Sequence, residues 1–300
     1  MSGAGLTGGT IAVTGASGFI GRYLCADLAA AGYGVLRLGR GAGMDRQTDY
    51  ATPGLSEALQ GADAVVHLAG RRMTREDAAL DLAPFWPPNV AGIGDLVAAA
   101  KANGLRKIVL ASTIAVYSAG SGMPFCETAP ARPINAYALS KLMAEAHLEM
   151  LTRAAGPAAI ALRLAAVYGH GEKGTPALMR FVDQATAGQQ IVLQGNPDTR
   201  IDQIYVRDAS AALIAALRHP TATGVFNAGG GQPWALREMA EAACDIFGTP
   251  GHLRIEHTGT DAMPHPVMDL TRTRDALDWQ PAHDLRQGLL DFRKTRDAAA

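Results

Sequence analysis

The chain has 300 residues, of which 48% are hydrophobic and 18% charged, and its net charge of −1 gives no reason to expect nucleic acid or an anionic membrane as a partner. Its cysteines, Cys25, Cys126 and Cys244, are far apart and form no Cys-x-x-Cys or His/Cys cluster, which argues against a disulfide framework and a metal site. Neither a signal-peptide pattern nor an apolar run of bilayer length is present, so a cytoplasmic location is the default expectation.

Strand-like apolar runs alternate with helical patterns through the first half of the chain. The expected strands are Thr10–Thr14, Val35–Leu38, Ala64–Leu68, Lys107–Ala111 and Ala158–Leu164. The expected helices are Phe19–Ala31, Leu55–Gln60, Val90–Asn103 and Tyr137–Ala155. This alternation predicts an α/β fold with a doubly wound parallel sheet covered by helices on both faces.

The composition changes after Tyr168, where loop and turn signals become frequent. A helix at Arg207–Arg218, a short strand at Gly224–Asn227 and a helix at Ala235–Phe247 are expected there. We expect residues 1–168 with about 205–229 to form a dinucleotide-binding domain. Residues of about 169–204 and 230–300 are expected to form a smaller C-terminal lobe that binds the substrate.

A glycine-rich turn separates the first expected strand from the first expected helix. Gly15, Gly18 and Gly21 form Gly-x-x-Gly-x-x-Gly in this position. The glycines allow a tight turn, close approach of a pyrophosphate and close packing of helix on sheet, which indicates a Rossmann-type dinucleotide site. The residues of this turn expected to contact the cofactor are Gly15, Ser17, Gly18, Phe19, Ile20 and Gly21.

The end of the second expected strand bears on the choice between NAD and NADP. An acidic residue there would bind the ribose 2′-hydroxyl of NAD and repel a 2′-phosphate. This chain has Gly39-Arg40 instead, and Arg22 follows the glycine motif. Arginine forks suit phosphate oxygens. We therefore predict NADP in preference to NAD, with Arg40 on the phosphate; a solvated surface arginine is the alternative.

A second motif, Tyr137-Ala-Leu-Ser-Lys141, indicates the chemistry. Tyr137 and Lys141 lie four residues apart on an expected helix and so share one face. A neighbouring ammonium and a nicotinamide cation favour the phenolate, which suits Tyr137 to exchange a proton with a substrate oxygen while hydride moves. Lys141 is also expected to bond the cofactor ribose. Ser112 and Thr113 close a strand at the edge where such sheets bind ligands, and Thr113 is the expected partner of the reacting carbonyl.

With these residues the chain resembles the extended short-chain dehydrogenase/reductase family, in its NAD(P)-dependent epimerase/dehydratase branch, over essentially its whole length. The segments that carry the resemblance are Asp49-Tyr50, His67–Gly70, Asn89–Gly92, Ala111–Tyr117, Glu127–Pro130, Arg163–Gly169, Phe226–Gly231 and Leu277–Pro281. The resemblance implies that Asp49 and Tyr50 meet the adenine. It implies further cofactor contacts by Leu68, Ala69, Gly70, Asn89, Ser112 and Ala165, and a catalytic hydroxyl on Thr113.

The resemblance also implies that the C-terminal lobe binds the substrate, commonly a nucleotide-linked sugar. Two departures from the family pattern bear on this point: Ala166 replaces an asparagine that often bonds substrate phosphates, and Arg200 is shifted by one position. The side chains expected to meet the substrate are those of Arg72, Thr113, Ala166 and Arg200, with Arg71 and Arg180 as further cations for phosphates.

The two residues after the catalytic threonine narrow the reaction type. Sugar dehydratases resembling this family carry Asp-Glu there, whereas this chain has Ile114-Ala115, so we exclude dehydration. Epimerisation through a transient ketone and simple reduction at C4 of a sugar both remain. An NADPH-dependent reductase of a small non-sugar ketone or aldehyde is the alternative, and a non-catalytic dinucleotide sensor is disfavoured by the Tyr-Lys pair.

Two further interpretations concern assembly and histidines. Members of the family often dimerise through helices that correspond to Val90–Asn103 and Tyr137–Ala155, which suggests a homodimer. The apolar run Leu96–Ala100 suits that interface and equally suits burial against the sheet. His67 lies in an apolar strand and is expected to be a hydrogen-bonded core residue rather than a base. The remaining histidines show no metal-ligand spacing.

Overall fold

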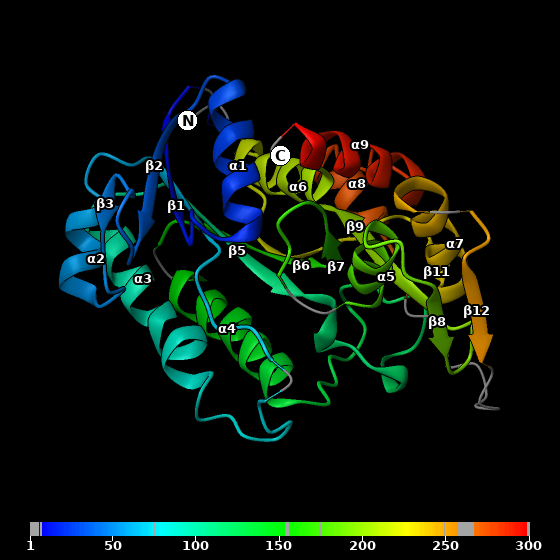
Figure 1. The fold of residues 1–300 in the computed structure, drawn as a ribbon. Helices are drawn as coiled ribbons and strands as arrows, with labels where there is room; N and C mark the ends of the chain where they lie inside the picture. The colour runs from blue at the N-terminus through cyan, green and yellow to red at the C-terminus, as the bar shows by residue number, and fades with distance from the viewer. Residues whose placement is uncertain are drawn as a thin grey trace.

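A seven-stranded parallel sheet forms the centre of the computed structural model, which describes residues 6, 8–74, 76–153, 156–173, 176–248, 250–256 and 267–298 (Figure 1). Its strands are β1 (Thr10–Thr14), β2 (Gly34–Gly39), β3 (Arg46–Gln47), β4 (Ala64–His67), β5 (Lys107–Thr113), β6 (Ala158–Leu164) and β10 (Gly224–Ala228). Their order is β10-β6-β5-β4-β1-β2-β3. The predicted doubly wound sheet is confirmed, and its order reverses between β1 and β4, where ligands of such sheets bind.

Helices cover both faces of this sheet. One face carries α1 (Phe19–Ala30) and α6 (Val206–Arg218), which pack on each other. The opposite face carries α2 (Thr52–Ala58), α3 (Gly92–Ala102) and α4 (Ala136–Arg153), as Figure 1 shows. The sheet therefore separates two apolar cores.

Alternate side chains along each strand pack into the two cores on opposite faces of the sheet. On β1, Ile11 and Val13 join the core under α1 and α6, whereas Ala12 joins the core under α3 and α4. On β5, Val109 and Ile108 divide in the same way. All five side chains are fully buried, which explains why these strands read as continuous apolar runs.

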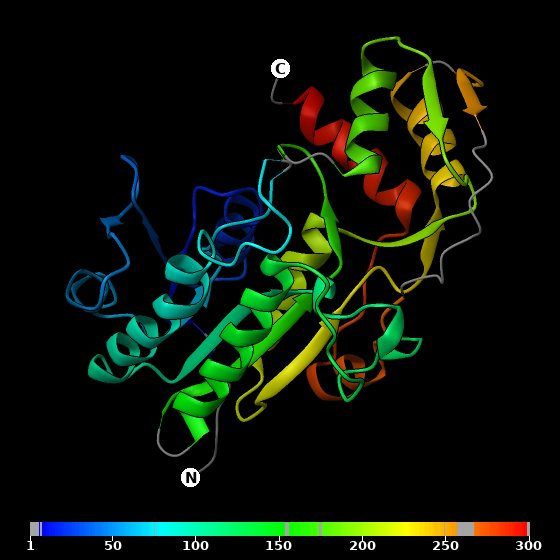
Figure 2. The same ribbon diagram turned by 90° about the horizontal axis from the view of Figure 1, so that it is seen from below.

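Smaller sheets and helices follow β6. One sheet has the order β11-β9-β7, from β7 (Ala166–Tyr168), β9 (Arg200–Tyr205) and β11 (Pro233–Ala235). The other pairs β8 (Ile191–Gln194) with β12 (Leu253–Glu256). Around them lie α5 (Ala177–Thr186), α7 (Leu236–Phe247) and α9 (Leu285–Asp297), which share a third apolar core (Figure 2). The short α8 (Thr271–Leu277) packs instead against β10.

The expected helix Val90–Asn103 differs in its first turns. Residues Trp86–Ala91 form a π-helical segment, η1, that contains two prolines, and α3 begins only at Gly92. A proline removes a backbone donor and clashes with the preceding turn, which explains the wider winding. In the run Leu96–Ala100, all residues except Ala98 are buried within this chain, so the apolar run serves its own core. The homodimer stays a prediction, and so do the expected domain boundaries.

Candidate active site

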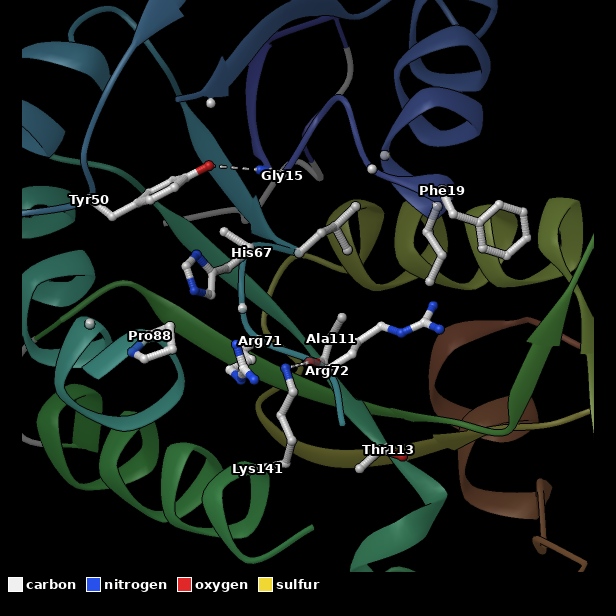
Figure 3. A pocket seen from close by; sticks show the side chains of 18 of the residues that line it. Gly15, Phe19, Tyr50, His67, Arg71, Arg72, Pro88, Ala111, Thr113 and Lys141 are labelled. Carbon is white, nitrogen blue, oxygen red and sulfur yellow. Dashed lines mark hydrogen bonds between the residues drawn. The ribbon is translucent and has the colours of Figure 1, made fainter. Parts of the chain in front are cut away.

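A cavity of about 1140 Å³ opens at the carboxyl ends of β1, β4, β5 and β6 (Figure 3). Nearly all residues predicted from the sequence to form the site line it: Gly15, Ser17, Gly18, Phe19, Ile20, Gly21, Arg40, Asp49, Tyr50, Leu68, Ala69, Gly70, Arg72, Ser112, Thr113, Tyr137, Lys141, Ala165 and Ala166. Asn89 and Arg200 are the predicted site residues that do not line it.

The glycine turn is packed so closely that side chains are excluded. Gly15 has a φ of +68°, and a Cβ on it would lie 2.9 Å from the backbone nitrogen of Ala69. A Cβ on Gly21 would lie 2.3 Å from the carbonyl oxygen of Gly15. Helix α1 begins after Gly18 without a side-chain cap. Its first amide groups therefore face the cavity side of a tight glycine cradle, which fits the pyrophosphate of a dinucleotide.

One end of the cavity is formed by Tyr50 and Arg40. The Tyr50 hydroxyl accepts a hydrogen bond from the backbone N–H of Gly15 at 3.3 Å, as Figure 3 shows. The guanidinium of Arg40 lies over the Tyr50 ring, 5.5 Å from its centroid. Arg22, the other arginine considered for a 2′-phosphate, lies instead against Gly171 and lines an adjacent cavity of about 620 Å³. Only Arg40 of these two cations therefore lies at this end.

Helix α4 brings Tyr137 and Lys141 to the end of β5. The Tyr137 hydroxyl lies within hydrogen-bonding reach of the Thr113 side chain. The Lys141 ammonium donates to the carbonyl oxygen of Ala111 at 2.9 Å (Figure 3). The ring of Phe85, which sequence reasoning missed, packs against Tyr137 with centroids 6.0 Å apart. The two side chains thus share a face, as predicted, and the phenol meets the predicted threonine.

The electrostatics of this pair differ from the expectation. Burial raises the pKa of Tyr137, and the charge that opposes this effect is that of Arg72, together with the hydrogen bond from Thr113. Burial lowers the pKa of Lys141 to about 8, against the opposing carboxylate of Glu145. Because the ammonium is directed at the Ala111 carbonyl, the phenol gains less from it than the four-residue spacing suggested.

A buried acid that sequence reasoning missed lies one turn beyond Lys141. The Glu145 carboxylate accepts hydrogen bonds from the Ser112 hydroxyl and from the Arg163 guanidinium, the latter at 2.7 Å from Nη2. Arg163 also donates to the Tyr117 hydroxyl at 2.6 Å. The sequence signal was the spacing Tyr137-Lys141-Glu145, which repeats every four residues along one helix face.

His67 and Thr14 fix the ends of the two central strands. The His67 Nδ1 lies 2.9 Å from the Thr14 hydroxyl, which also accepts from the backbone N–H groups of Leu68 and Ala69 at 3.2 Å. Burial, with the nearby Lys141 charge, lowers the pKa of His67 to about 3. His67 therefore stays neutral and hydrogen-bonded near pH 7, in agreement with the core role expected from the sequence.

Asn89 lies behind the cavity wall. Its Oδ1 accepts from the Arg71 N–H at 2.8 Å, and its Nδ2 donates to the Arg71 carbonyl at 3.0 Å and to the Ser140 hydroxyl at 2.9 Å. Ser140 in turn donates to the Tyr137 carbonyl at 2.7 Å. The amide thus joins the loop after β4 to α4. Asn89 does not line the cavity, and its direct contact with a cofactor stays a prediction.

Arginines at the mouth of the cavity are engaged by carboxylates. Arg72 forms a double hydrogen bond with Glu172, both at 2.9 Å, and so connects the loop after β4 with the loop after β7. Arg71 pairs with Asp77 at 2.6 Å. Arg200 lies in the small sheet, where its guanidinium meets the carbonyl of Pro233 and the carboxylate of Glu238. The structure therefore brings Arg72, but not Arg200, to the predicted site.

Neither a metal centre nor a membrane span is found in the part of the chain that the structure describes. No group of three or more His, Cys, Asp or Glu side chains there could hold a metal ion. His257 and His265, considered in the sequence, lie outside the described residues. No helix within the described ranges has both the length and the apolar character needed to cross a bilayer.

Comparison with known proteins agrees with this geometry. The model of the NAD dependent epimerase/dehydratase family matches residues 11–229. The UDP-glucose 4-epimerase of Azospirillum brasilense is 30% identical over 93% of this chain and 89% of its own length. The crystal structure of the UDP-N-acetylglucosamine 4-epimerase from Bacillus cereus superposes with a TM-score of 0.89 at 29% identity, covering 96% of each chain. The 2-alkyl-3-oxoalkanoate reductase of Shewanella oneidensis is 32% identical over 70% of this chain and 58% of its own length.

The family match runs from β1 to just beyond β10 and includes the glycine turn and the Tyr137–Lys141 pair. The sequence motifs, the strand order and the match over most of the chain agree on one assignment. The chain belongs to the NAD dependent epimerase/dehydratase family, in the extended short-chain dehydrogenase/reductase class, and is an NAD(P)-dependent enzyme.

Proposed function

We propose that the protein acts by hydride and proton transfer on a keto or alcohol group of a sugar-like substrate, one that is linked to a nucleotide, as an epimerase or a 4-keto reductase. The observation that carries the proposal is the contact between the Tyr137 phenol and Thr113 at the edge of a glycine-lined cavity. The relatives named above as epimerases of UDP-sugars support the substrate class.

In this proposal Tyr137 gives a proton to, or takes one from, the reacting oxygen, and Thr113 orients that oxygen. Lys141 bonds the cofactor ribose. A bound nicotinamide ring supplies the hydride acceptor or donor. The residues that would hold the dinucleotide are Gly15, Ser17, Gly18, Phe19, Ile20, Gly21, Arg40, Asp49, Tyr50, Leu68, Ala69, Gly70, Ser112, Tyr137, Lys141 and Ala165.

On the substrate side the proposal rests on Arg72, Thr113 and Ala166, which line the same cavity. The Arg72 guanidinium suits a phosphate oxygen because it presents a planar fork of donors. To reach a substrate phosphate it has to exchange its bonds to Glu172. Arg200 is left out of the proposal because its guanidinium is engaged outside the cavity.

The test is a direct assay of nucleotide sugars. UDP-glucose and UDP-N-acetylglucosamine are incubated separately with the purified protein and catalytic NAD or NADP, and the C4 stereochemistry is followed by proton NMR. We expect one of them to approach an equilibrium mixture of C4 epimers. If neither is converted with either cofactor, the epimerase form of the proposal fails.

A second candidate is reduction of a small, non-sugar ketone or aldehyde by NADPH. It is favoured by Ala166, whose side chain has no polar atom for a substrate phosphate, and by the similarity to a 2-alkyl-3-oxoalkanoate reductase. Oxidation of NADPH, measured at equal concentrations of nucleotide-linked 4-ketosugars and simple ketones, separates the two candidates. Turnover of simple ketones alone would favour the second.

We further propose that the enzyme prefers NADP, because Arg40 is the cation at the Tyr50 end of the cavity. Replacing Arg40 with Ala is expected to weaken NADP binding by about 2 kcal/mol, roughly 30-fold, while NAD binding changes little. Titration of both cofactors by intrinsic fluorescence measures the difference.

The matched control is Arg37→Ala. Arg37 lies on β2, three residues before Arg40, but its guanidinium is paired with Asp45 and does not line the cavity. This variant should bind both cofactors as the wild type does. Equal losses of NAD and NADP in Arg40→Ala, or no loss of either, would contradict the NADP preference.

A further inference from the structure

Next to the Tyr137–Lys141 pair lies a cluster of buried charged side chains, formed by Lys141, Glu145 and Arg163. Glu145 and Arg163 are each 5% exposed and Lys141 is 8% exposed. The cluster thus contains two cations and one carboxylate. Charges are rarely buried to this degree unless they are paired, because removing them from water is costly. Arg163 pairs directly with Glu145 at 2.7 Å, whereas the Lys141 ammonium donates to the Ala111 carbonyl and lies one helical turn from Glu145.

The hydrogen bonds of Glu145 are saturated. Its Oε1 accepts from the Ser112 hydroxyl and from Arg163 Nε at 3.1 Å, and its Oε2 accepts from Arg163 Nη2 at 2.7 Å. Such a fork between a guanidinium and a carboxylate is the strong, geometrically defined form of an ion pair. It ties α4, which carries Glu145, to β6, which carries Arg163. The carboxylate is consequently held in a single orientation.

This ion pair is connected to the catalytic residues through the end of β5. Ser112, which bonds Glu145, directly follows Ala111, whose carbonyl holds the Lys141 ammonium at 2.9 Å. Lys141 and Glu145 are also four residues apart on the same helix face. Two routes, one through the strand end and one through space, therefore link the Glu145 carboxylate to the position and charge of Lys141.

We propose that Glu145 is a positioning residue of the reaction: anchored by Arg163 and Ser112, it fixes the end of β5 and supplies the counter-charge for Lys141. This inference rests on the proposed function, in which Lys141 bonds the cofactor ribose. Glu145 itself does not line the cavity, so it acts through Lys141 and Ser112.

The charged and titratable groups around Lys141 set the direction of the effect. His67 on β4 is neutral near pH 7, Arg163 on β6 is a cation, and Tyr137 on α4 carries a proton in the cofactor-free protein. Glu145 is thus the negative group whose charge raises the pKa of Lys141 and so opposes the effect of burial. Without its charge, Lys141 should lose its proton at a lower pH.

The first test measures the titration of Lys141 directly and needs neither cofactor nor substrate. Lysine side chains are labelled with carbon-13, and the Lys141 signal is assigned by its loss in Lys141→Met. In Glu145→Gln the signal is expected to titrate about one pH unit lower than in the wild type. The control is Glu149→Gln, on the same helix but at an exposed surface pair with Arg153, and it should titrate as the wild type does.

The second test follows dinucleotide binding against pH. In Glu145→Gln the loss of affinity at alkaline pH should move downward by the same amount as the Lys141 titration. An unchanged Lys141 titration in Glu145→Gln overturns the inference. If neither the wild type nor Glu145→Gln binds a dinucleotide at any pH, the proposed function fails. The NMR titration still decides whether Glu145 affects Lys141.

Glu145→Gln leaves the Arg163 cation buried without a counter-charge, which could prevent folding. Glu145→Asp is the second variant, because it keeps the negative charge but withdraws the carboxylate from both Ser112 and Arg163. It is expected to fold, to keep the Lys141 titration close to that of the wild type, and to bind the dinucleotide about tenfold more weakly, through misplacement of the strand end. Wild-type affinity in Glu145→Asp would overturn the positioning role.

Discussion

Tyr137→Phe is expected to lower turnover by about 10³-fold while dinucleotide affinity stays within about threefold of the wild type. The substitution removes the hydroxyl that meets Thr113 but keeps the ring that packs against Phe85. The proton transfer then has no donor at the reacting oxygen, whereas the glycine turn and Lys141 are untouched. Steady-state turnover of the substrate identified by the assays above, together with cofactor titration, measures both quantities.

The control for this prediction is Tyr33→Phe. Tyr33 precedes β2, at the edge of the sheet opposite the cavity, and its hydroxyl donates to the carbonyl of Leu6 at 2.6 Å. Loss of that bond should leave turnover unchanged. If Tyr137→Phe retained full turnover, the proton-transfer role would be wrong. If neither protein turned over any substrate but both bound dinucleotide, a non-catalytic sensor would be favoured.

Gly21→Ala is expected to weaken dinucleotide binding strongly and to destabilise the protein by about 3 kcal/mol, the upper part of the range for overpacking. The added methyl group would lie 2.3 Å from the Gly15 carbonyl and 2.8 Å from the backbone of Ala16. None of these atoms belongs to a flexible side chain, so the whole turn has to shift. A cost of about 3 kcal/mol in affinity corresponds to roughly 100-fold weaker binding.

Gly41→Ala is the matched substitution at the same cavity. Gly41 also lines the wall, but a Cβ there meets no atom within 4 Å and its φ lies outside the range that disfavours side chains. Urea unfolding and cofactor titration should therefore give wild-type values for Gly41→Ala. Wild-type stability in Gly21→Ala would show that the turn is less closely packed than these distances indicate.

The glycine turn and the helix with Tyr137 could be predicted because local sequence determines both. The strand Thr10–Thr14 and the glycine spacing are contiguous, and the Tyr-Lys pair requires only one helix. Parallel strands that are buried on both faces also give continuous apolar runs, so the strands of the central sheet could be predicted as well. These parts needed no knowledge of contacts between distant segments.

The supporting contacts could not be predicted because they join distant segments. Glu145 and Arg163 come from a helix and a strand, and Arg72 and Glu172 are 100 residues apart. Strands of two or three residues, such as β3 and β11, have too little pattern to stand out from loops. The prediction for Asn89 gave its general location but not its partners, which depend on the π-helical segment η1.

The expectation that Lys141 acidifies Tyr137 shows a related limit. The spacing of two residues on a helix predicts whether their side chains share a face. The direction in which a lysine ammonium points depends on the hydrogen-bond acceptor within its reach. Here the acceptor is the Ala111 carbonyl, at the end of a strand about 30 residues earlier in the chain. Burial, which no local pattern reveals, then dominates the pKa of both groups.

The position of β10 determines when the sheet can be completed during synthesis and where the chain can be truncated. β10 is the outermost strand beside β6, yet some sixty residues of other structure separate the two in the chain, and α6, which covers α1, belongs to the same late segment. During synthesis the sheet therefore remains unfinished, with one side of β6 unpaired, until residue 228 has left the ribosome. A fragment that stops after β7 would keep every residue of the glycine turn and still lack α6, which packs on the helix that the turn begins.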